Sequence, residues 1–239
     1  MLTVTGTGLE ESLARLTDLE RNQLPFATAL ALTRVAEDVK TRLQGEMRSV
    51  FDRPTPYTLD SLRLIPATKE RLSARVWIKD EADKASPATR WLTPEVFGGN
   101  RREKRVETLL QNRGLIGSGR YITPAKGAKL DRYGNLNRGQ LQQILSGLGA
   151  QFDRYSNSTD SRRSRGNRVR FFVMRKAGRA FAIGERLGKR SIAVRLAIVA
   201  RPNYSTRLDF FAIGEAEARA RLPSRFEAAL AQALRSARS

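Results

Sequence analysis

The 239-residue sequence contains no histidine and no cysteine. Without histidine it lacks the side chain that most often transfers protons near neutral pH. Without cysteine it has no thiolate nucleophile, no disulfide and no thiolate ligand for zinc. Acidic residues are also scarce, with 24 Asp and Glu against 44 Lys and Arg, so the formal net charge is +20. This composition favours binding and assembly over catalysis.

Long apolar runs are missing as well. No stretch approaches the roughly 20 apolar residues that span a bilayer, and residues 1–6 lack the basic leader and apolar core of a signal peptide. We therefore expect a soluble protein made in the cytoplasm, with no membrane partner. The positive charge needs an acidic counterpart, of which nucleic acid is the commonest. Anionic lipid, an acidic protein and simple solvation of the arginines remain open at this point.

Hydrophobic residues make up 40% of the chain and recur at helical spacing near both ends. A first stripe consists of Leu9, Leu13, Leu16 and Leu19, and a second runs through residues 25–50. The second stripe predicts a continuous helix about 39 Å long, which Pro54 and Pro56 prevent from continuing. Near the other end, apolar spacing predicts helices on either side of Pro223.

Strand patterns lie between these helices. Residues 62–65 and 72–79 predict an antiparallel pair in which Trp77 points away from the buried face, either as a rim residue or as an interface anchor. Residues 169–174, 180–183 and 193–199 predict three more strands, the first two joined by a hairpin at 176–179. Residues 80–150 predict only short helices at 106–110 and 140–145. Residues 156–168, rich in Ser, Asn and Arg, predict a mobile loop.

These elements predict an α+β fold, in which long N-terminal and C-terminal helices pack on one antiparallel sheet of about five strands. Residues 1–79 and 169–239 are expected to form one core domain. Residues 80–168 are expected to be a basic insertion or arm, since residues 101–138 alone carry ten Lys and Arg against three acidic residues.

Motifs for catalysis are weak. Gly184 and Gly188 suggest a phosphate-binding loop, but three residues separate them instead of four, and Arg190 occupies the position of the magnesium-binding Ser or Thr. Two clusters of acidic residues could in principle hold magnesium in a nuclease. A solvated helix face and a strand-end turn explain them more simply, so we expect no catalytic residue, metal or cofactor. The two acidic clusters are Glu37 and Asp38 beside Lys40, and Asp80, Glu81 and Asp83 beside Lys84.

The strongest candidate for a binding site is an arginine-rich stretch of eighteen residues without any acidic residue. Guanidinium groups can bind phosphate through two parallel hydrogen bonds. No helix-turn-helix, zinc-finger or RNA-recognition signature accompanies the charge, so contact with nucleic acid is expected to be non-specific. Phe171 and Phe172 lie within the stretch, and at least one of them is expected in the core. The candidate phosphate-contacting residues are Arg162, Arg163, Arg165, Arg168, Arg170, Arg175, Lys176 and Arg179.

The order of these features resembles a known family. A helix containing residues 29–36 (ALALTRVA) is followed by a turn with Pro54, Thr55, Thr58, Ser61 and Leu62, a strand pair and an Ala-rich closing helix. This order is similar to that of the minor tail and neck proteins of tailed bacteriophages, including the lambda-type minor tail protein Z, or tail-completion, family. The resemblance covers residues 25–79 and, more loosely, residues 190–238. Residues 80–168 do not match it.

The resemblance implies a non-enzymatic structural protein of the virion, made in the host cytoplasm and placed in the tail or at the head–tail junction. Its partners would be other neck and tail proteins in a ring or another multi-copy assembly, and in places packaged double-stranded DNA. Trp77 and Trp91 are the candidate anchors for protein contacts. A free nucleic-acid-binding accessory protein is the alternative function, and a metal-dependent nuclease ranks third.

Overall fold

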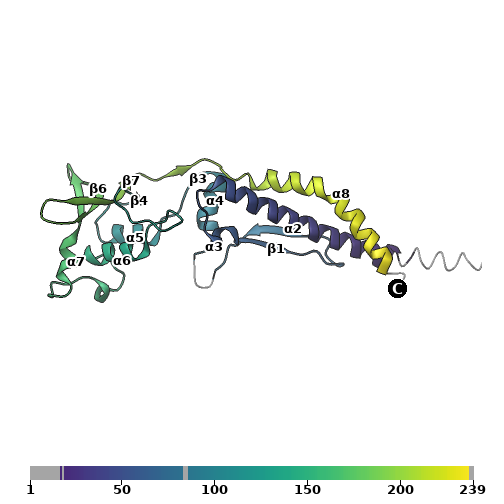
Figure 1. The fold of residues 1–239 in the computed structure, drawn as a ribbon, viewed down its shortest axis with the longest axis horizontal. Helices are drawn as coiled ribbons and strands as arrows, with labels where there is room; N and C mark the ends of the chain where they lie inside the picture. The colour runs from purple at the N-terminus through teal and green to yellow at the C-terminus, as the bar shows by residue number, and fades with distance from the viewer. Residues whose placement is uncertain (1–16, 18, 83–85, 237–239) are drawn as a thin grey trace, which may run out of the picture. The chain divides into compact units, whose positions relative to one another are not determined.

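The computed structural model describes residues 17, 19–82 and 86–236, and the chain divides into two compact units. One unit consists of Met1–Leu92 and Arg207–Ser239, and we call it the helical unit. The other, Thr93–Thr206, is the sheet unit. Figure 1 shows the elements of both units. The predicted helix around the first leucine stripe falls almost wholly outside the described residues.

Two long antiparallel helices form the frame of the helical unit. After a π-helical turn, η1 (Leu19–Gln23), helix α2 (Leu24–Val50) forms where the sequence predicted a helix over residues 25–50, with Pro25 in its first turn. Helix α8 (Phe210–Ser236) packs along it (Figure 1). A buried cluster joins Ala27 and Ala31 of α2 to Ala229 and Ala233 of α8, all fully buried. Small side chains at these positions let the two helix backbones approach closely.

The helical unit also contains helix α3 (Pro56–Leu59), a separate strand pair and the start of helix α4 (Thr89–Phe97). Strands β1 (Leu62–Ile65) and β2 (Arg75–Ile78) are antiparallel, with Leu62 opposite Ile78. The strand predicted over 72–79 is shorter than expected, since it begins at Arg75, and Leu72 before it is exposed.

The sheet unit is built on a four-stranded antiparallel sheet in the order β4-β7-β6-β5. Its strands are β4 (Tyr121–Pro124), β5 (Phe171–Lys176), β6 (Arg179–Arg186) and β7 (Ile192–Val199). A second pair joins β3 (Gly99–Asn100) to β8 (Asn203–Tyr204). The β5–β6 hairpin confirms the predicted turn, because Ala177 and Gly178 both have positive φ angles, 48° and 76°.

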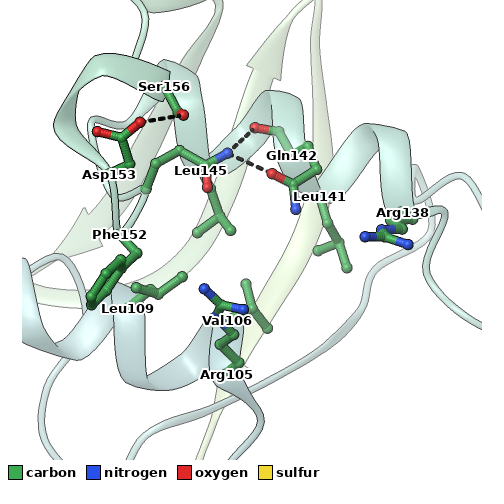
Figure 2. A pocket seen from close by; sticks show the side chains of 11 residues that line it. Arg105, Val106, Leu109, Arg138, Leu141, Gln142, Leu145, Phe152, Asp153 and Ser156 are labelled. Carbon is green, nitrogen blue, oxygen red and sulfur yellow. Dashed lines mark hydrogen bonds between the residues drawn. The ribbon is translucent and has the colours of Figure 1, made fainter. Parts of the chain in front are cut away.

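Helices α5 (Arg105–Asn112) and α6 (Arg138–Gly147) share one apolar core with the sheet, in which Leu110 and Ile144 meet Ile183 and Leu196. The short helices η2 (Arg154–Ser156) and α7 (Arg165–Arg170) follow. Between α5, α6 and residues 151–156 lies a groove of about 360 Å³ (Figure 2).

The α+β class and the long helices at both ends are confirmed, but one sheet of about five strands is not formed. The strands at 62–65 and 75–78 pair only with each other, and β4 takes a place in the main sheet that the sequence analysis did not predict. The chain also divides differently from the expected boundaries. Residues 80–168 contribute α5, β4 and α6 to the sheet unit instead of standing apart as an arm, and α8 alone returns to the helical unit.

Local differences have local causes. The strand predicted from residue 169 begins at Phe171, because residues 165–170 continue the turn before them as helix α7. The two helices predicted around Pro223 form one helix, α8, with this proline inside it. Among the described helices, none is both long and apolar enough to cross a membrane.

Candidate nucleic-acid interface

Positive charge is concentrated in the sheet unit. Thr93–Thr206 contains 24 Lys and Arg against seven Asp and Glu, a formal net charge of +17. The helical unit contains 20 Lys and Arg against 17 Asp and Glu, a net charge of only +3. One unit therefore carries almost all of the excess that a polyanion would neutralise.

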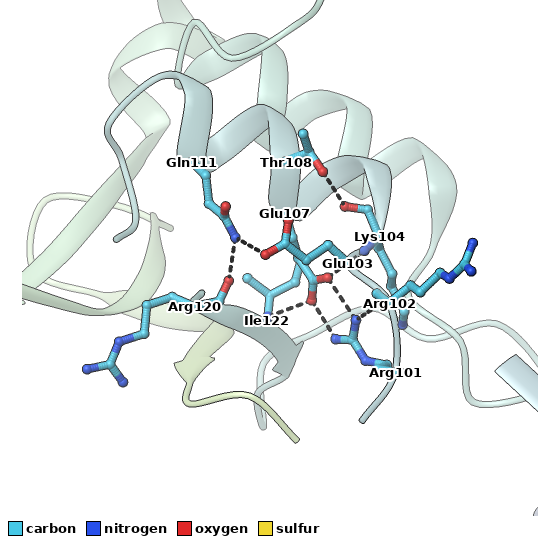
Figure 3. A network of polar contacts seen from close by, with 9 residues as sticks. All are labelled: Arg101, Arg102, Glu103, Lys104, Glu107, Thr108, Gln111, Arg120 and Ile122. Carbon is cyan, nitrogen blue, oxygen red and sulfur yellow. Dashed lines mark hydrogen bonds and ion pairs between the residues drawn. The ribbon is translucent and has the colours of Figure 1, made fainter. Parts of the chain in front are cut away.

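The few carboxylates of the sheet unit are used inside it. Glu107 on α5 is fully buried, and both of its oxygens accept hydrogen bonds from Arg101, one of them at 2.8 Å (Figure 3). The backbone N–H groups of Lys104 and Ile122 donate to it at 2.6 and 2.9 Å. Burial alone would raise the pKa of Glu107, but these four hydrogen bonds outweigh burial and hold the pKa below its ordinary value. The same pair raises the pKa of Arg101, which lies over the Tyr121 ring.

A second buried carboxylate joins three elements. Glu185 on β6 is 1% exposed and forms ion pairs with Arg195 on β7 and Arg170 on α7. Arg195 also donates to the carbonyl of Gly127 in the loop after β4. Arg170, a predicted phosphate contact, is therefore half-buried and paired with the protein's own carboxylate.

The structure separates the predicted arginine stretch into two groups. Strand β5 lies between them, and its six residues span about 20 Å at 3.3 Å per residue. We call the group at the tip of the β5–β6 hairpin the hairpin cluster: Arg175, Lys176 and Arg179. The group at the other end of β5, on α7 and the turn before it, is the α7 cluster: Arg162, Arg163, Arg165 and Arg168.

Most members of these clusters are available to a ligand. All seven are exposed. Arg168 pairs with Asp160 at 2.6 Å, and Arg175 donates to the carbonyls of Gly178 and Leu115. Within the part of the chain that the structure describes, the other five make no ion pair.

Three further basic residues extend the α7 cluster. Strand β6 returns from the hairpin tip to α7, where Arg186 donates to the carbonyl of Val169 at 2.8 Å and lies 4.1 Å from the centre of the Phe172 ring. The turn between β6 and β7 places exposed Lys189 and Arg190 at the same end of the sheet. None of these three residues was among the predicted phosphate contacts, because the pattern around Gly184 and Gly188 suggested only an incomplete phosphate-binding loop. The predicted β-hairpin was the signal that could have found them.

Helix α7 sits against α6 at a glycine. A Cβ atom at Gly147 would lie 2.7 Å from the carbonyl oxygen of Asn167 and 3.0 Å from Cδ2 of Phe171. Asn167 also donates to the carbonyl of Gln143 at 3.1 Å. Only glycine therefore lets α7 approach α6 this closely.

Replacing Gly147 by alanine is expected to destabilise the sheet unit by about 1–3 kcal/mol, because the backbone of α7 has to move away. Hydrogen exchange over Arg165–Arg170 should become faster. Gly45→Ala is the matched control, since a Cβ there meets nothing within 4 Å, and it should stabilise α2 by about 0.5–1 kcal/mol. Unchanged exchange in α7 of the Gly147 variant would contradict the assigned packing.

The other predicted site residues lie in the helical unit. Trp91 packs against Tyr57 with ring centres 5.8 Å apart, and Trp77 stands opposite Arg63 in the strand pair. Both tryptophans are half-buried, so neither is a fully exposed anchor. Their role as protein contacts stays a prediction.

Among the described residues, no three or more His, Cys, Asp or Glu side chains gather where they could hold a metal ion. Asp38 instead accepts two hydrogen bonds, at 2.8 and 2.7 Å, from Arg225 on α8. These hydrogen bonds lower the pKa of Asp38. Asp83 and Lys84 fall outside the described residues.

The arrangement presents two clusters of exposed Arg and Lys side chains on a unit with strong net positive charge. Comparisons with protein-family profiles, with curated proteins and with solved structures found no match to this chain.

Proposed function

We propose that the chain is a non-enzymatic structural protein of a tailed bacteriophage, which works in several copies in the tail or head–tail junction beside packaged DNA. The observation that carries this proposal is the division of charge between the two units. The sheet unit, at +17, suits contact with a polyanion, whereas the nearly balanced helical unit suits contact with protein.

The residues behind the sequence resemblance support the same proposal. Residues 25–79 and α8 come together in the helical unit, although more than 100 residues separate them in the chain. Part of the looser match, residues 190–206, belongs to the sheet unit. The segment that does not match the family therefore forms most of a unit with its own core, which can provide a second binding surface on a shared helical frame.

Contact with DNA would be made through phosphates. Arginine on short helices and turns reaches phosphate oxygens without reading bases, and the two clusters about 20 Å apart can bind separate phosphates of a duplex. Such binding is independent of sequence and weakens steeply with salt, because each phosphate contact releases a counterion.

Replacing Arg162, Arg163 and Arg165 by serine is expected to make DNA binding less dependent on salt. Each lost phosphate contact should reduce the slope of log K against log salt by about 0.9, so the triple variant should lose about 2–3 units. Fluorescence anisotropy with a 30-base-pair duplex between 50 and 300 mM salt measures this slope. A triple serine variant in the helical unit is the matched control and should keep the wild-type slope: Arg21, Arg63 and Arg75. Equal slopes in both variants would contradict the α7 cluster as the DNA contact.

Quantitative mass spectrometry of purified phage particles tests the structural role. We expect the protein in mature particles at a fixed copy number of several per virion. Its absence from particles, together with tight and salt-sensitive DNA binding, would instead favour the accessory nucleic-acid-binding protein. Nicking of plasmid DNA in the presence of magnesium, abolished by Asp80→Ala with Asp83→Ala, would favour the nuclease.

A further inference from the structure

The groove of the sheet unit combines an apolar floor with a basic rim. Its volume of about 360 Å³ lies within the range of about 300–1,000 Å³ found for ligand pockets. Figure 2 shows Leu109 from α5 and Leu141 and Leu145 from α6 around the opening, with Phe152 at one side. Phe152 is 83% exposed, which is unusual for a phenylalanine beside other apolar side chains.

Two arginines at the starts of the helices supply the charge. Arg105 and Arg138 are the first residues of α5 and α6, and both are exposed and line the groove. Among the described residues neither forms an ion pair. The one carboxylate at the groove, Asp153, accepts hydrogen bonds from Tyr155 N–H and from Ser156 Oγ, both at 3.0 Å. The groove therefore suits a segment with apolar side chains and neighbouring carboxylates.

The chain contains a segment of this kind near its amino end. Leu9, Leu13 and Leu16 are spaced as on one face of a helix, and Glu10 and Glu11 lie between the first two leucines. Residues 9–16 contain two acidic residues and one arginine, within a protein whose net charge is +20. Their charge is thus complementary to that of the sheet unit.

We propose that residues 9–16 of one copy bind in the groove between α5 and α6 of a neighbouring copy. The leucines enter between Leu109 and Leu141, and the glutamates pair with Arg105 and Arg138. Such a contact joins different surfaces of two copies, so it is head-to-tail and can close into a ring. This inference rests on the multi-copy assembly of the proposed function and names the contact that would hold the copies together.

A labelled peptide tests the groove on the full-length protein. A fluorescein-labelled peptide of residues 7–18 should bind with a saturable anisotropy change. Arg105→Glu with Arg138→Glu should weaken this binding by at least about tenfold, equivalent to 1.4 kcal/mol. Arg120→Glu with Arg113→Glu is the matched control, because these exposed arginines belong to the same unit but do not line the groove. Equal weakening in both variants would show general charge attraction and overturn the proposal.

The peptide's own chemistry gives a second test. Replacing its Leu9 and Leu13 by serine keeps the charge and should weaken binding by a similar factor, because the apolar floor is no longer filled. Equal affinity of the two peptides would also overturn the proposal.

The two leucine-to-serine changes, made in the full chain, test whether the bound segment comes from a neighbouring copy. In the absence of DNA, light scattering should show a mass that rises with concentration for the wild type, and a monomer for Leu9→Ser with Leu13→Ser. A wild-type monomer at all concentrations would mean that the segment binds within its own chain or not at all, and would overturn the proposal. The variant's incorporation into particles is measured separately. Oligomers that persist in this variant contradict the groove contact, whereas absence of the wild type from particles contradicts the virion role.

Discussion

Replacing Glu107 by alanine is expected to lower the free energy of unfolding of the sheet unit by about 3–5 kcal/mol, the usual cost of removing one partner of a buried ion pair. Arg101, only 8% exposed, would keep its charge without a carboxylate to accept its hydrogen bonds. The N–H groups of Lys104 and Ile122 would lose their acceptor too. Lys104 is the N-cap of α5 and Ile122 lies in β4, so helix and strand would lose the group that joins them.

Glu103→Ala is the matched control for this variant. Glu103 is half-buried and accepts one hydrogen bond from Gln111 at 3.1 Å. Its replacement should lower the free energy of unfolding by less than about 1.5 kcal/mol. Hydrogen exchange over residues 105–124 measures the effect within the sheet unit itself. A loss below 1.5 kcal/mol in the Glu107 variant would show that water or a rearranged neighbour replaces the carboxylate.

The pH dependence of stability follows from the same group. The folded state lowers the pKa of Glu107 below its unfolded value of about 4.3, so the unfolded chain binds the proton more readily. The stabilisation is therefore complete above pH 4.3 and is lost as the pH falls through the lower, folded pKa. Denaturant titrations of the wild type and Glu107→Ala should differ most at neutral pH and converge in acid. A difference that stays constant into acid would contradict this linkage.

Sequence reasoning predicted elements whose signal is local. Helix α2 follows from regular apolar spacing after Pro25, and the hairpin at 176–179 follows from two short apolar strands around a glycine. Both depend on neighbours along the chain, so one sequence contains the information. Strand β4 carried no such signal, because it has only four residues and ends in Pro124. It becomes a strand through its pairing with β7.

The candidate site shows the same limit. The sequence identified an arginine-rich stretch, but only the structure separates it into two clusters at opposite ends of β5 and assigns Arg170 to buried Glu185. The charge of +17 on one unit likewise depends on a boundary at Thr93 and Thr206, which depends on the packing of segments far apart in the chain. Long-range packing decides which charged side chains are available to a ligand and which form ion pairs inside the protein.

Replacing Val39 by aspartate is expected to destabilise the helical unit by more than about 4 kcal/mol and to leave most of the protein insoluble. Val39 is 8% exposed on α2 and faces Gly214 of α8, where a Cβ would lie 3.6 Å from Val39 Cγ1. An aspartate there loses the apolar contact and brings a carboxylate into the helix interface. Arg225 of α8 is already bound by Asp38 through two hydrogen bonds.

The control for this variant is Thr41→Asp, an exposed position on the same helix that gains the same charge and should change stability by less than about 0.5 kcal/mol. Both tryptophans of the chain belong to the helical unit, so their fluorescence during denaturation reports on this unit alone. Val39→Thr supplies a milder change for the case in which the aspartate variant cannot be purified. It should lower the free energy of unfolding of this unit by about 1–3 kcal/mol, because its hydroxyl is buried. A soluble Val39→Asp protein with the wild-type fluorescence midpoint would mean that the α2–α8 interface does not hold this unit together.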